Sequence, residues 1–258
     1  MTSRTLCLEN RLIALFPCSN LFLSIILISA GGRLESNPLH IDLVIPVYNE
    51  MDGIQIFHHV LSSAVENLPY AFQIYYINDG SLDRTAEILE EIARVDHRVV
   101  IVELSRNFGH QAALTAGLDL ANGDYVISLD GDGQHPPERI GEMVQVAVQQ
   151  NYDIVIMQRI AEISPNSFAK RISWKNKTSD LFYQLINRIG DTRIVPGAAD
   201  FRLMSHAAVL ALRSMPEYSR FLRGMVNWMG FHTLILPYDQ SPRLAGRSKY
   251  TLPKMLHL

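Results

Sequence analysis

Two aspartates stand one residue apart where an apolar, β-rich run ends, in the sequence YVISLDGDGQHPPE of residues 125–138. Carboxylates at the mouth of a buried strand are costly unless something neutralises their charge. A divalent cation does so, and Mg²⁺ or Mn²⁺ also leaves positions open for phosphate oxygens. We therefore predict that Asp130 and Asp132 hold such an ion, with Gln134 adding a third oxygen directly or through water.

Other interpretations of this aspartate pair can be compared with the metal site. An EF-hand loop needs glycine at its sixth position and glutamate at its twelfth, where this chain has His135 and Gly141. A phosphatase of the haloacid-dehalogenase type also uses D-x-D-G at a strand end, but that motif opens such domains, whereas several strands precede it here. The last alternative is a pair of loop aspartates beside turn glycines.

The elements that must position these residues alternate between strands and helices from residue 41 onwards. Apolar β-branched runs predict the strands, and apolar residues at helical spacing predict the helices. The alternation favours an α/β fold with a mainly parallel sheet and right-handed crossovers. The predicted strands are 41–47, 72–81, 98–107, 124–133, 152–159 and one near 232–238; the predicted helices are 52–68, 81–94, 110–123, one opened by Pro136 and Pro137, and 168–189.

Polar clusters end the first five strands. Ligands of parallel sheets bind at the carboxyl ends of the strands, so we expect these clusters to converge on one crevice. Asp79 can accept hydrogen bonds there from a base or a ribose, although N-D-G-S is also an ordinary turn. No G-x-G-x-x-G follows a strand, so a dinucleotide cofactor is not expected. The clusters are residues 48–50, 78–80, 105–107, 130–132 and 158–159.

Composition and charge exclude several classes of protein. The chain has 258 residues, 48% apolar and 19% charged, which is typical of a globular protein with an ample core. Both cysteines, Cys7 and Cys18, lie near the N-terminus, so the body of the chain has no disulfide framework or Cys-based zinc site. Residues 1–158 carry 8 Lys and Arg against 20 Asp and Glu, whereas residues 159–258 carry 15 against 6. The basic half suits phosphates or an anionic membrane, unless it is merely a solvated surface.

An uncharged run occupies residues 12–32, after Arg4 and Arg11. Its length is enough to span a bilayer, although Pro17 and Asn20 weaken its first half. Three interpretations stay open: a membrane anchor, a signal peptide, or a leader that precedes the ordered domain.

Six motifs occur in order along the chain: VIPVYNE, INDGSLDRT, LSRNFGHQAALTAGL, LDGDGQHPPE, ADFRLMS and RLAGRSKY. Together they closely resemble family 2 glycosyltransferases that act on polyprenyl phosphates, such as dolichol-phosphate mannose synthases and undecaprenyl-phosphate glycosyltransferases. The resemblance covers residues 41–250. It implies a GT-A type fold for nucleotide-diphospho-sugar transferases, with a mainly parallel, Rossmann-like sheet flanked by helices. The implied domains are a leader (1–39), a catalytic domain (40–250) and a C-terminal tail (251–258).

The resemblance also implies roles for particular residues. Asp132, Asp200 and Arg202 would serve catalysis, with Asp200 acting either as a base or by orienting the sugar or a basic residue. The metal, Mg²⁺ or Mn²⁺, would bind Asp130, Asp132 and Gln134. Lys175 and Ser179 would meet the lipid phosphate from a basic helix, unless that helix face is simply solvated. The nucleotide-sugar would contact Pro46, Tyr48, Glu50, Ile77, Asp79, Asp130, Gly131, Asp132, Arg159, Arg243 and Lys249.

The implied reaction is an inverting sugar transfer from a UDP- or GDP-linked donor to undecaprenyl or dolichyl phosphate. The leaving nucleoside diphosphate gathers negative charge, which a metal and Arg or Lys side chains stabilise. The acceptor phosphate is already a nucleophile. The implied location is the cytoplasmic face of a membrane, with the chain bound peripherally or through a single pass at residues 12–32. We predict no nucleic-acid partner, and the sequence indicates no oligomeric state.

Two departures from the family pattern lead to further expectations. Bacterial members continue past the SKY motif into transmembrane helices, so the alternative is a truncated relative that binds nucleotide-sugar or a membrane partner without turnover. Gly131 and Gly133 stand where larger residues are common, so we expect a looser loop that keeps all its oxygen ligands. His110 and His135 are expected to support the site rather than to bind the metal.

Overall fold

The computed structural model describes residues 38–160, 198–217, 220–241 and 243, together with three short strands in the first 37 residues. These strands, β1 (Cys7–Leu8), β2 (Arg11–Ile13) and β3 (Leu27–Ser29), form an antiparallel sheet in the unit Met1–Asn37. The second unit, Pro38–Leu258, contains every other described element.

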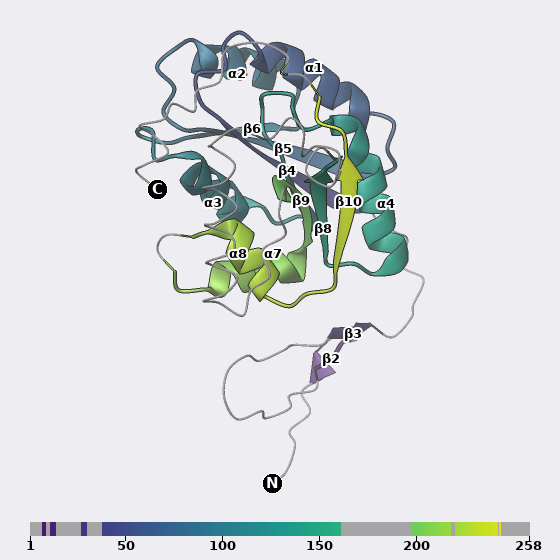
Figure 1. The fold of residues 1–258 in the computed structure, drawn as a ribbon. Coiled ribbons are helices and arrows are strands. Elements are labelled where there is room, and N and C mark those ends of the chain that lie inside the picture. Colours follow the sequence, from purple (N-terminus) through teal and green to yellow (C-terminus); the bar gives the residue numbers. More distant parts are fainter. Residues whose placement is uncertain are drawn as a thin grey trace, which may run out of the picture. The chain divides into compact units, whose positions relative to one another are not determined.

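Seven strands form the sheet of the second unit, in the order β10-β8-β9-β7-β4-β5-β6 (Figure 1). β9 is antiparallel to both of its neighbours, β7 and β8, and all other neighbouring pairs are parallel. The expected mainly parallel α/β sheet is therefore confirmed. The strands are β4 (His40–Val47), β5 (Ala71–Asn78), β6 (Val99–Glu103), β7 (Tyr125–Ser128), β8 (Ile154–Arg159), β9 (Ala198–Ser205) and β10 (Thr233–Tyr238).

Helices cover both faces of this sheet (Figure 1). α1 (Ile54–Val65), α2 (Thr85–Val95) and α4 (Ile140–Gln150) share one hydrophobic cluster with the sheet, and the short 3₁₀ helix η1 (Pro137–Arg139) leads into α4. The second cluster contains residues of α3 (His110–Leu120), α7 (His206–Ser214) and α8 (Leu222–Trp228).

The side-chain alternation of β4 explains why both faces are apolar. Ile41, Leu43 and Ile45 belong to the first cluster, whereas Val44 belongs to the second, and all four are fully buried. Successive side chains of a strand point to opposite faces of its sheet. A central parallel strand that is covered on both sides therefore reads as a continuous apolar run, as the sequence of β4 does.

Asp42 interrupts that run and is fully buried. Its Oδ2 accepts hydrogen bonds from the backbone N–H groups of Asn122 (2.6 Å) and Gly123 (2.8 Å). A buried carboxylate needs such donors, and here they come from the connection between α3 and β7. Asp42 thus ties the end of α3 to the central strand.

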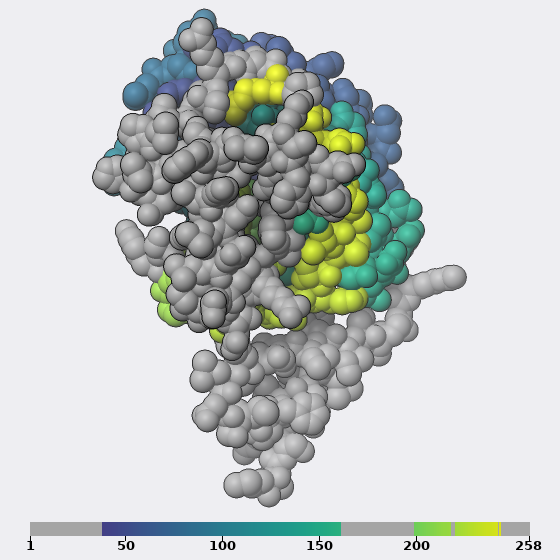
Figure 2. All heavy atoms as spheres, viewed as in Figure 1, coloured from purple at the N-terminus to yellow at the C-terminus, as the bar shows by residue number. Residues whose placement is uncertain are grey.

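The edge strand β10 packs beside α4. Figure 2 shows the atoms of these two elements next to one another on the face in view, and Arg139 Nη2 donates a hydrogen bond to the carbonyl oxygen of Pro237 at 3.2 Å. This contact links the start of α4 to the carboxyl end of the edge strand.

Several predictions from the sequence fall on residues that the structure does not describe. They concern Lys175, Ser179, Lys249, the helix 168–189 and most of residues 12–32. Among the described residues, no helix has both the length and the apolar character needed to cross a membrane.

Candidate functional site

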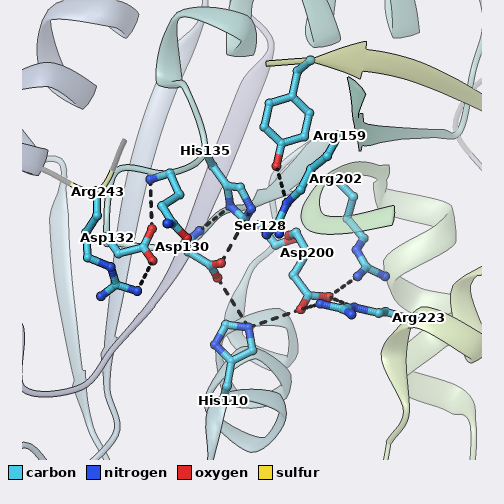
Figure 3. Close-up of polar contacts among 12 residues, drawn as sticks. His110, Ser128, Asp130, Asp132, His135, Arg159, Asp200, Arg202, Arg223 and Arg243 are labelled. Atoms are coloured by element: carbon cyan, nitrogen blue, oxygen red, sulfur yellow. Dashed lines mark hydrogen bonds and ion pairs between the residues drawn. The ribbon is translucent and has the colours of Figure 1, made fainter. Parts of the chain in front are cut away.

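The reversed direction of β9 brings Asp200 to the carboxyl edge of the parallel strands. Ser128, the last residue of β7, pairs with Arg202, so the antiparallel register places residue 200 level with residue 130. The Ser128 hydroxyl donates a hydrogen bond to the Asp200 carbonyl oxygen at 2.6 Å. The predicted cluster of residues 130–132 therefore meets Asp200 of the ADFRLMS motif, although 70 positions separate residues 130 and 200 (Figure 3).

The loop that follows β7 is closely packed. A Cβ added at Gly131 would lie 2.8 Å from Val47 Cγ1 and 3.3 Å from Ile45 Cγ2, which is closer than side chains normally approach. Gly133 has a positive φ of 79°, which glycine adopts without strain. Asp132 Oδ1 accepts the backbone N–H of Gln134 at 2.9 Å. Gly131 therefore allows the loop to pack directly on β4, where a larger residue would not fit.

Two histidines face Asp130. The buried His135 accepts the Asp130 backbone N–H on Nδ1 at 3.0 Å, and its Nε2 lies 3.6 Å from Asp130 Oδ2. Burial lowers the pKa of His135, so its neutral form is favoured. His110 Nε2 lies 3.5 Å from Asp130 Oδ1 and 3.4 Å from Asp200 Oδ2, so this ring bridges the two carboxylates (Figure 3).

Asp200 is buried, and its carboxylate pairs with two arginines. Arg223 of α8 donates two hydrogen bonds to it, from Nη2 to Oδ2 at 2.8 Å and from Nε to Oδ1 at 3.2 Å. Arg202 also donates to Oδ1. Burial opposes the charge of Asp200, but the hydrogen bond from His110 and the charges of Arg202 and Arg223 outweigh it, and the pKa of Asp200 lies well below its ordinary value. For His110, burial is likewise outweighed by Asp200 and Asp130, and its pKa is raised.

Arg243 joins the first and fourth polar clusters. Its Nη2 lies 2.8 Å from Asp132 Oδ2, and its Nη1 lies 3.6 Å from Glu50 Oε1. At the end of β8, Arg159 Nε donates to the Tyr238 hydroxyl at 3.3 Å. The structure thus places Arg159 and Arg243, the two predicted donor-binding arginines, at the carboxyl edge of the sheet (Figure 3).

In the second polar cluster, Asp79 fixes the loop of residues 107–109. Asp79 is 3% exposed, and its carboxylate accepts the Asn107 side-chain amide and the backbone N–H groups of Phe108 and Gly109 at 2.7–2.9 Å. These bonds fix the connection that enters α3, immediately before His110. Sequence reasoning assigned Asp79 to the nucleotide and did not predict this structural use.

The remaining predicted donor contacts lie around the ends of β4 and β5. Pro46 and Ile77 are buried, and Ile77 belongs to the hydrophobic cluster on the α3 face. Tyr48 and Glu50 are half-buried, in a turn whose Asn49 has a positive φ of 51°. The Glu50 backbone N–H donates to Thr85 Oγ1 at 2.8 Å, which holds this turn against the start of α2.

A match to a protein-family model identifies the family of this chain. The model of glycosyl transferase family 2 matches residues 42–212, which is more than half of the chain. The chain belongs to glycosyl transferase family 2. This family 2 chain carries Asp130, Asp132, Asp200 and Arg202 within the matched region, whereas Arg223 and Arg243 lie beyond it.

Named relatives agree with the family assignment. The chain is 37% identical over 223 residues to an uncharacterized glycosyltransferase, YkcC, of Bacillus subtilis (strain 168), covering 86% of this chain and 67% of the relative. It is 38% identical over 220 residues to a bactoprenol glucosyl transferase of Shigella phage SfV, covering 85% and 69%. The chain thus spans about two thirds of the length of these relatives. The prediction of a glycosyltransferase is confirmed at the level of the family.

A solved structure supports the fold. The mannosyltransferase PcManGT from Pyrobaculum calidifontis, in complex with GDP-Man and Mn²⁺, matches with a TM-score of 0.55 and 16% sequence identity, covering 83% of this chain and 59% of that one. The GT-A fold that the motifs implied is therefore confirmed for this family 2 chain.

The donor set of the family 2 site fits a hard divalent cation in its chemistry. Asp130 Oδ1 is buried without a hydrogen-bond partner, and Asp132 supplies a second carboxylate nearby in the chain. Oxygen ligands of this kind suit Mg²⁺ or Mn²⁺, which keep several coordination positions for water or phosphate. No group of three or more His, Cys, Asp or Glu among residues 38–160, 198–217 and 220–241 is arranged to hold a metal by protein ligands alone.

Arg223 is the residue of this site that sequence reasoning missed. It lies in α8, outside the six motifs, in the segment RFLRGMVNW of residues 220–228, which contains two arginines among mainly apolar residues. Neither spacing nor composition identifies which arginine of this segment turns inward. The pairing with Asp200 becomes visible only when β9 and α8 are placed together.

Proposed function

We propose that this chain transfers a sugar, with inversion, from a UDP- or GDP-linked donor to a polyprenyl phosphate at the cytoplasmic face of a membrane. The observation that carries the proposal is the meeting of Asp130 and Asp132 with Asp200 and its arginines at the carboxyl edge of the sheet. The similarity to a protein named bactoprenol glucosyl transferase supports a polyprenyl phosphate acceptor. The fold likeness to PcManGT, whose complex contains GDP-Man and Mn²⁺, supports a nucleotide-sugar donor.

The donor side of the proposal uses the D-G-D loop. Asp130 and Asp132 would hold Mg²⁺ or Mn²⁺, with Gln134 following them in the chain. When bound, such an ion neutralises the charge that develops on the leaving diphosphate. Arg243, which lies against Asp132, and Arg159 at the end of β8 supply further positive charge for the same diphosphate.

His135 supports this side without changing its charge balance. Because His135 accepts the Asp130 backbone N–H on Nδ1, its neutral ring carries its proton on Nε2, the nitrogen that faces Asp130 Oδ2. The ring stacks on Phe201 with 5.3 Å between centroids. His135 therefore fixes the position of Asp130 relative to β9.

The acceptor side of the proposal needs orientation more than proton removal. A phosphate monoester carries negative charge near neutral pH and is itself a nucleophile. The pKa of Asp200 lies well below its ordinary value, which supports an orienting role for this carboxylate rather than the role of a base. Lys175 and Ser179, outside the described residues, would meet the lipid phosphate within the proposed catalytic domain of residues 40–250.

A thermal-shift panel on the purified chain tests the donor side. UDP, GDP, dTDP and CMP are each added with Mn²⁺ or with EDTA, to the unchanged chain and to Asp132→Ala. A ligand at about a hundred times its dissociation constant adds about 2.7 kcal/mol, which moves the melting temperature by several degrees. Glu142→Gln, an exposed acid of α4 paired with Arg139, is the matched control.

We expect one nucleotide to stabilise the unchanged chain and Glu142→Gln in the presence of Mn²⁺, and not Asp132→Ala. That nucleotide-sugar is then incubated with undecaprenyl phosphate in detergent, and the labelled lipid product is counted. Absence of any nucleotide-dependent shift would overturn the proposal. A shift without transfer to the lipid phosphate would point to the alternative of a binding protein.

A further inference from the structure

The Arg223 guanidinium is held in one orientation at the mouth of the site. It makes a two-point contact with Asp200 through Nη2 and Nε, which is the geometry that fixes a guanidinium plane. The side chain of Asp200 is 5% exposed, whereas that of Arg223 is 34% exposed. The pair therefore has a buried acidic end and an accessible basic end.

Asp200 lies among three basic side chains. The carboxylate pairs with Arg202, which is 3% exposed, as well as with Arg223. The buried Nε of Arg202 has no hydrogen-bond partner. One carboxylate thus faces two guanidinium groups, with the His110 ring beside it. Arg223 is the more exposed of the two arginines, and an oriented guanidinium of this kind suits a phosphate oxygen.

The position of Arg223 separates it from the donor side. Figure 3 shows Arg243 and Asp132 on one side of Asp130 and His110, and Arg223 on the other. In an inverting displacement, the nucleophile approaches the anomeric carbon from the side opposite to the leaving diphosphate. If Arg243 and Asp132 serve the leaving group, an anion at Arg223 occupies the side from which the nucleophile comes.

The segment that carries Arg223 has exposed aromatic side chains as well. Phe221, which precedes α8, is 41% exposed, and Trp228 at the end of α8 is 51% exposed. A lipid that carries a phosphate head group needs both kinds of contact, a cation for the phosphate and apolar side chains for the hydrocarbon. The segment of residues 221–228 contains side chains of both kinds.

We propose that Arg223 binds the phosphate of the lipid acceptor and that Asp200 acts by holding the Arg223 guanidinium in place. Arg223 is then a substrate-binding residue, and Asp200 is a positioning residue. This inference rests on the proposed function, because it assigns the acceptor side of the same site.

Binding of a short prenyl phosphate tests the inference without requiring turnover. The probe is geranyl monophosphate, titrated calorimetrically into the full chain that has been saturated with its stabilising nucleotide and Mn²⁺. Geraniol and inorganic phosphate are titrated in parallel, to separate the lipid from the phosphate. The variants are Arg223→Gln and Arg223→Lys. Arg220→Gln is the matched control, because Arg220 lies three residues earlier and pairs with Asp119 instead (2.8 Å).

We expect Arg223→Gln to weaken geranyl phosphate binding at least tenfold, Arg223→Lys to weaken it less, and Arg220→Gln to leave it unchanged. Geraniol is expected to bind more weakly than geranyl phosphate in every protein. The nucleotide-dependent thermal shift should be the same in all variants, which also shows that they fold. Loss of that shift in Arg223→Gln would place Arg223 on the donor side and overturn the inference.

The role of Asp200 is tested by combining variants. Asp200→Asn should weaken geranyl phosphate binding on its own but add little in the Arg223→Gln background, because residues that act through one another are not additive. Equal losses in both backgrounds would overturn the positioning role. A chain that binds its nucleotide but not geranyl phosphate would overturn the inference alone, whereas a chain that binds no nucleotide would overturn the proposed function itself.

Discussion

Arg243 and Asp132 meet although 111 positions separate them in the sequence, with Arg243 Nη2 only 2.8 Å from Asp132 Oδ2. The same guanidinium lies 3.6 Å from Glu50 Oε1. One cation therefore links the turn after β4 to the loop after β7. This relationship makes Arg243 part of the carboxyl-edge cluster that the proposed donor would enter.

Arg243→Gln is expected to weaken binding of the nucleoside diphosphate about tenfold, which corresponds to about 1.4 kcal/mol, because a charge-assisted contact is lost. The melting temperature without ligand should also fall, since Asp132 and Glu50, which are 13% and 11% exposed, lose the charge of the mostly buried Arg243 side chain. Calorimetric titration measures the affinity. Arg139→Gln, which removes an arginine paired with Glu142, is the control. Unchanged nucleotide affinity in Arg243→Gln would contradict the assignment.

Asp79→Asn is expected to destabilise the chain by about 1–3 kcal/mol, because the amide group that replaces one carboxylate oxygen cannot accept the loop donors. Asn107→Ala removes one of these donors without touching Asp79. If Asp79 serves only the loop, both variants should bind nucleotide alike once folded. A selective loss of nucleotide affinity in Asp79→Asn would instead support the predicted contact with the base. Urea unfolding and calorimetry give the two quantities.

Gly131→Ala is expected to cost about 1–3 kcal/mol of unfolding free energy, because the new methyl group overlaps Val47 Cγ1. The cost should shrink when Val47 is also replaced by alanine, which removes the overlapping atom. Gly141→Ala in α4 is the control, since its Cβ would meet only the flexible end of Leu68 at 3.1 Å. Equal melting temperatures for Gly131→Ala and the unchanged chain would contradict close packing of the loop.

Asp42→Ala is expected to lower the free energy of unfolding by about 2–4 kcal/mol, because the N–H groups of Asn122 and Gly123 lose their acceptor in a buried place. Asp119→Ala removes an exposed acid of α3 and should cost less than about 1 kcal/mol. Chemical denaturation at neutral pH distinguishes the two. A loss of similar size in both variants would show that Asp42 is not a structural tie.

His58 is expected to make stability depend on pH. Burial lowers its pKa from 6.5, although the charge of Asp96 opposes this, while Arg98 and His59 add to it. His58 Nδ1 lies 3.1 Å from the Tyr76 hydroxyl, and its Nε2 lies 3.5 Å from Asp96 Oδ2.

As the pH is lowered below 6.5, the unfolded chain takes up a proton at this position before the native chain does. The free energy of unfolding therefore decreases as the pH is lowered, until the pKa of His58 in the native chain is passed. His58→Gln should flatten the curve of unfolding free energy against pH in that window, and the exposed His59→Gln should not. Parallel curves for His58→Gln and the unchanged chain would contradict the prediction.

Much of the fold follows from local pattern in the sequence. The strands β4, β5 and β8 are apolar runs of the right length, and the helices between them show the 3.6-residue spacing of a buried stripe. The carboxyl-end rule then predicts that the loop of Asp130 faces the turn of Glu50, and Arg243 indeed contacts both regions. These features depend on residues close together in the chain and on the general properties of parallel sheets.

The rest depends on contacts that no local pattern contains. Asp200 and Arg202 alternate with the apolar Ala199, Phe201 and Leu203 of β9, a pattern that predicts a solvated polar face, whereas both polar side chains are buried. Their burial is tolerable only because they pair with one another and with Arg223. The role of Arg223 could not be predicted from local sequence, because its partner Asp200 lies 23 positions away on a different element.

The place of β9 in the sheet also affects how the chain can fold during translation. β8 is synthesised before β9, but its neighbours in the sheet are β9 and β10, so it cannot join the earlier strands until β9 has emerged. While residues 129–197 are translated, the edge of β7 that later pairs with β9 therefore has no partner strand. An unpaired strand edge of this kind is prone to wrong pairing, and closing it with β9 assembles the site in the same step.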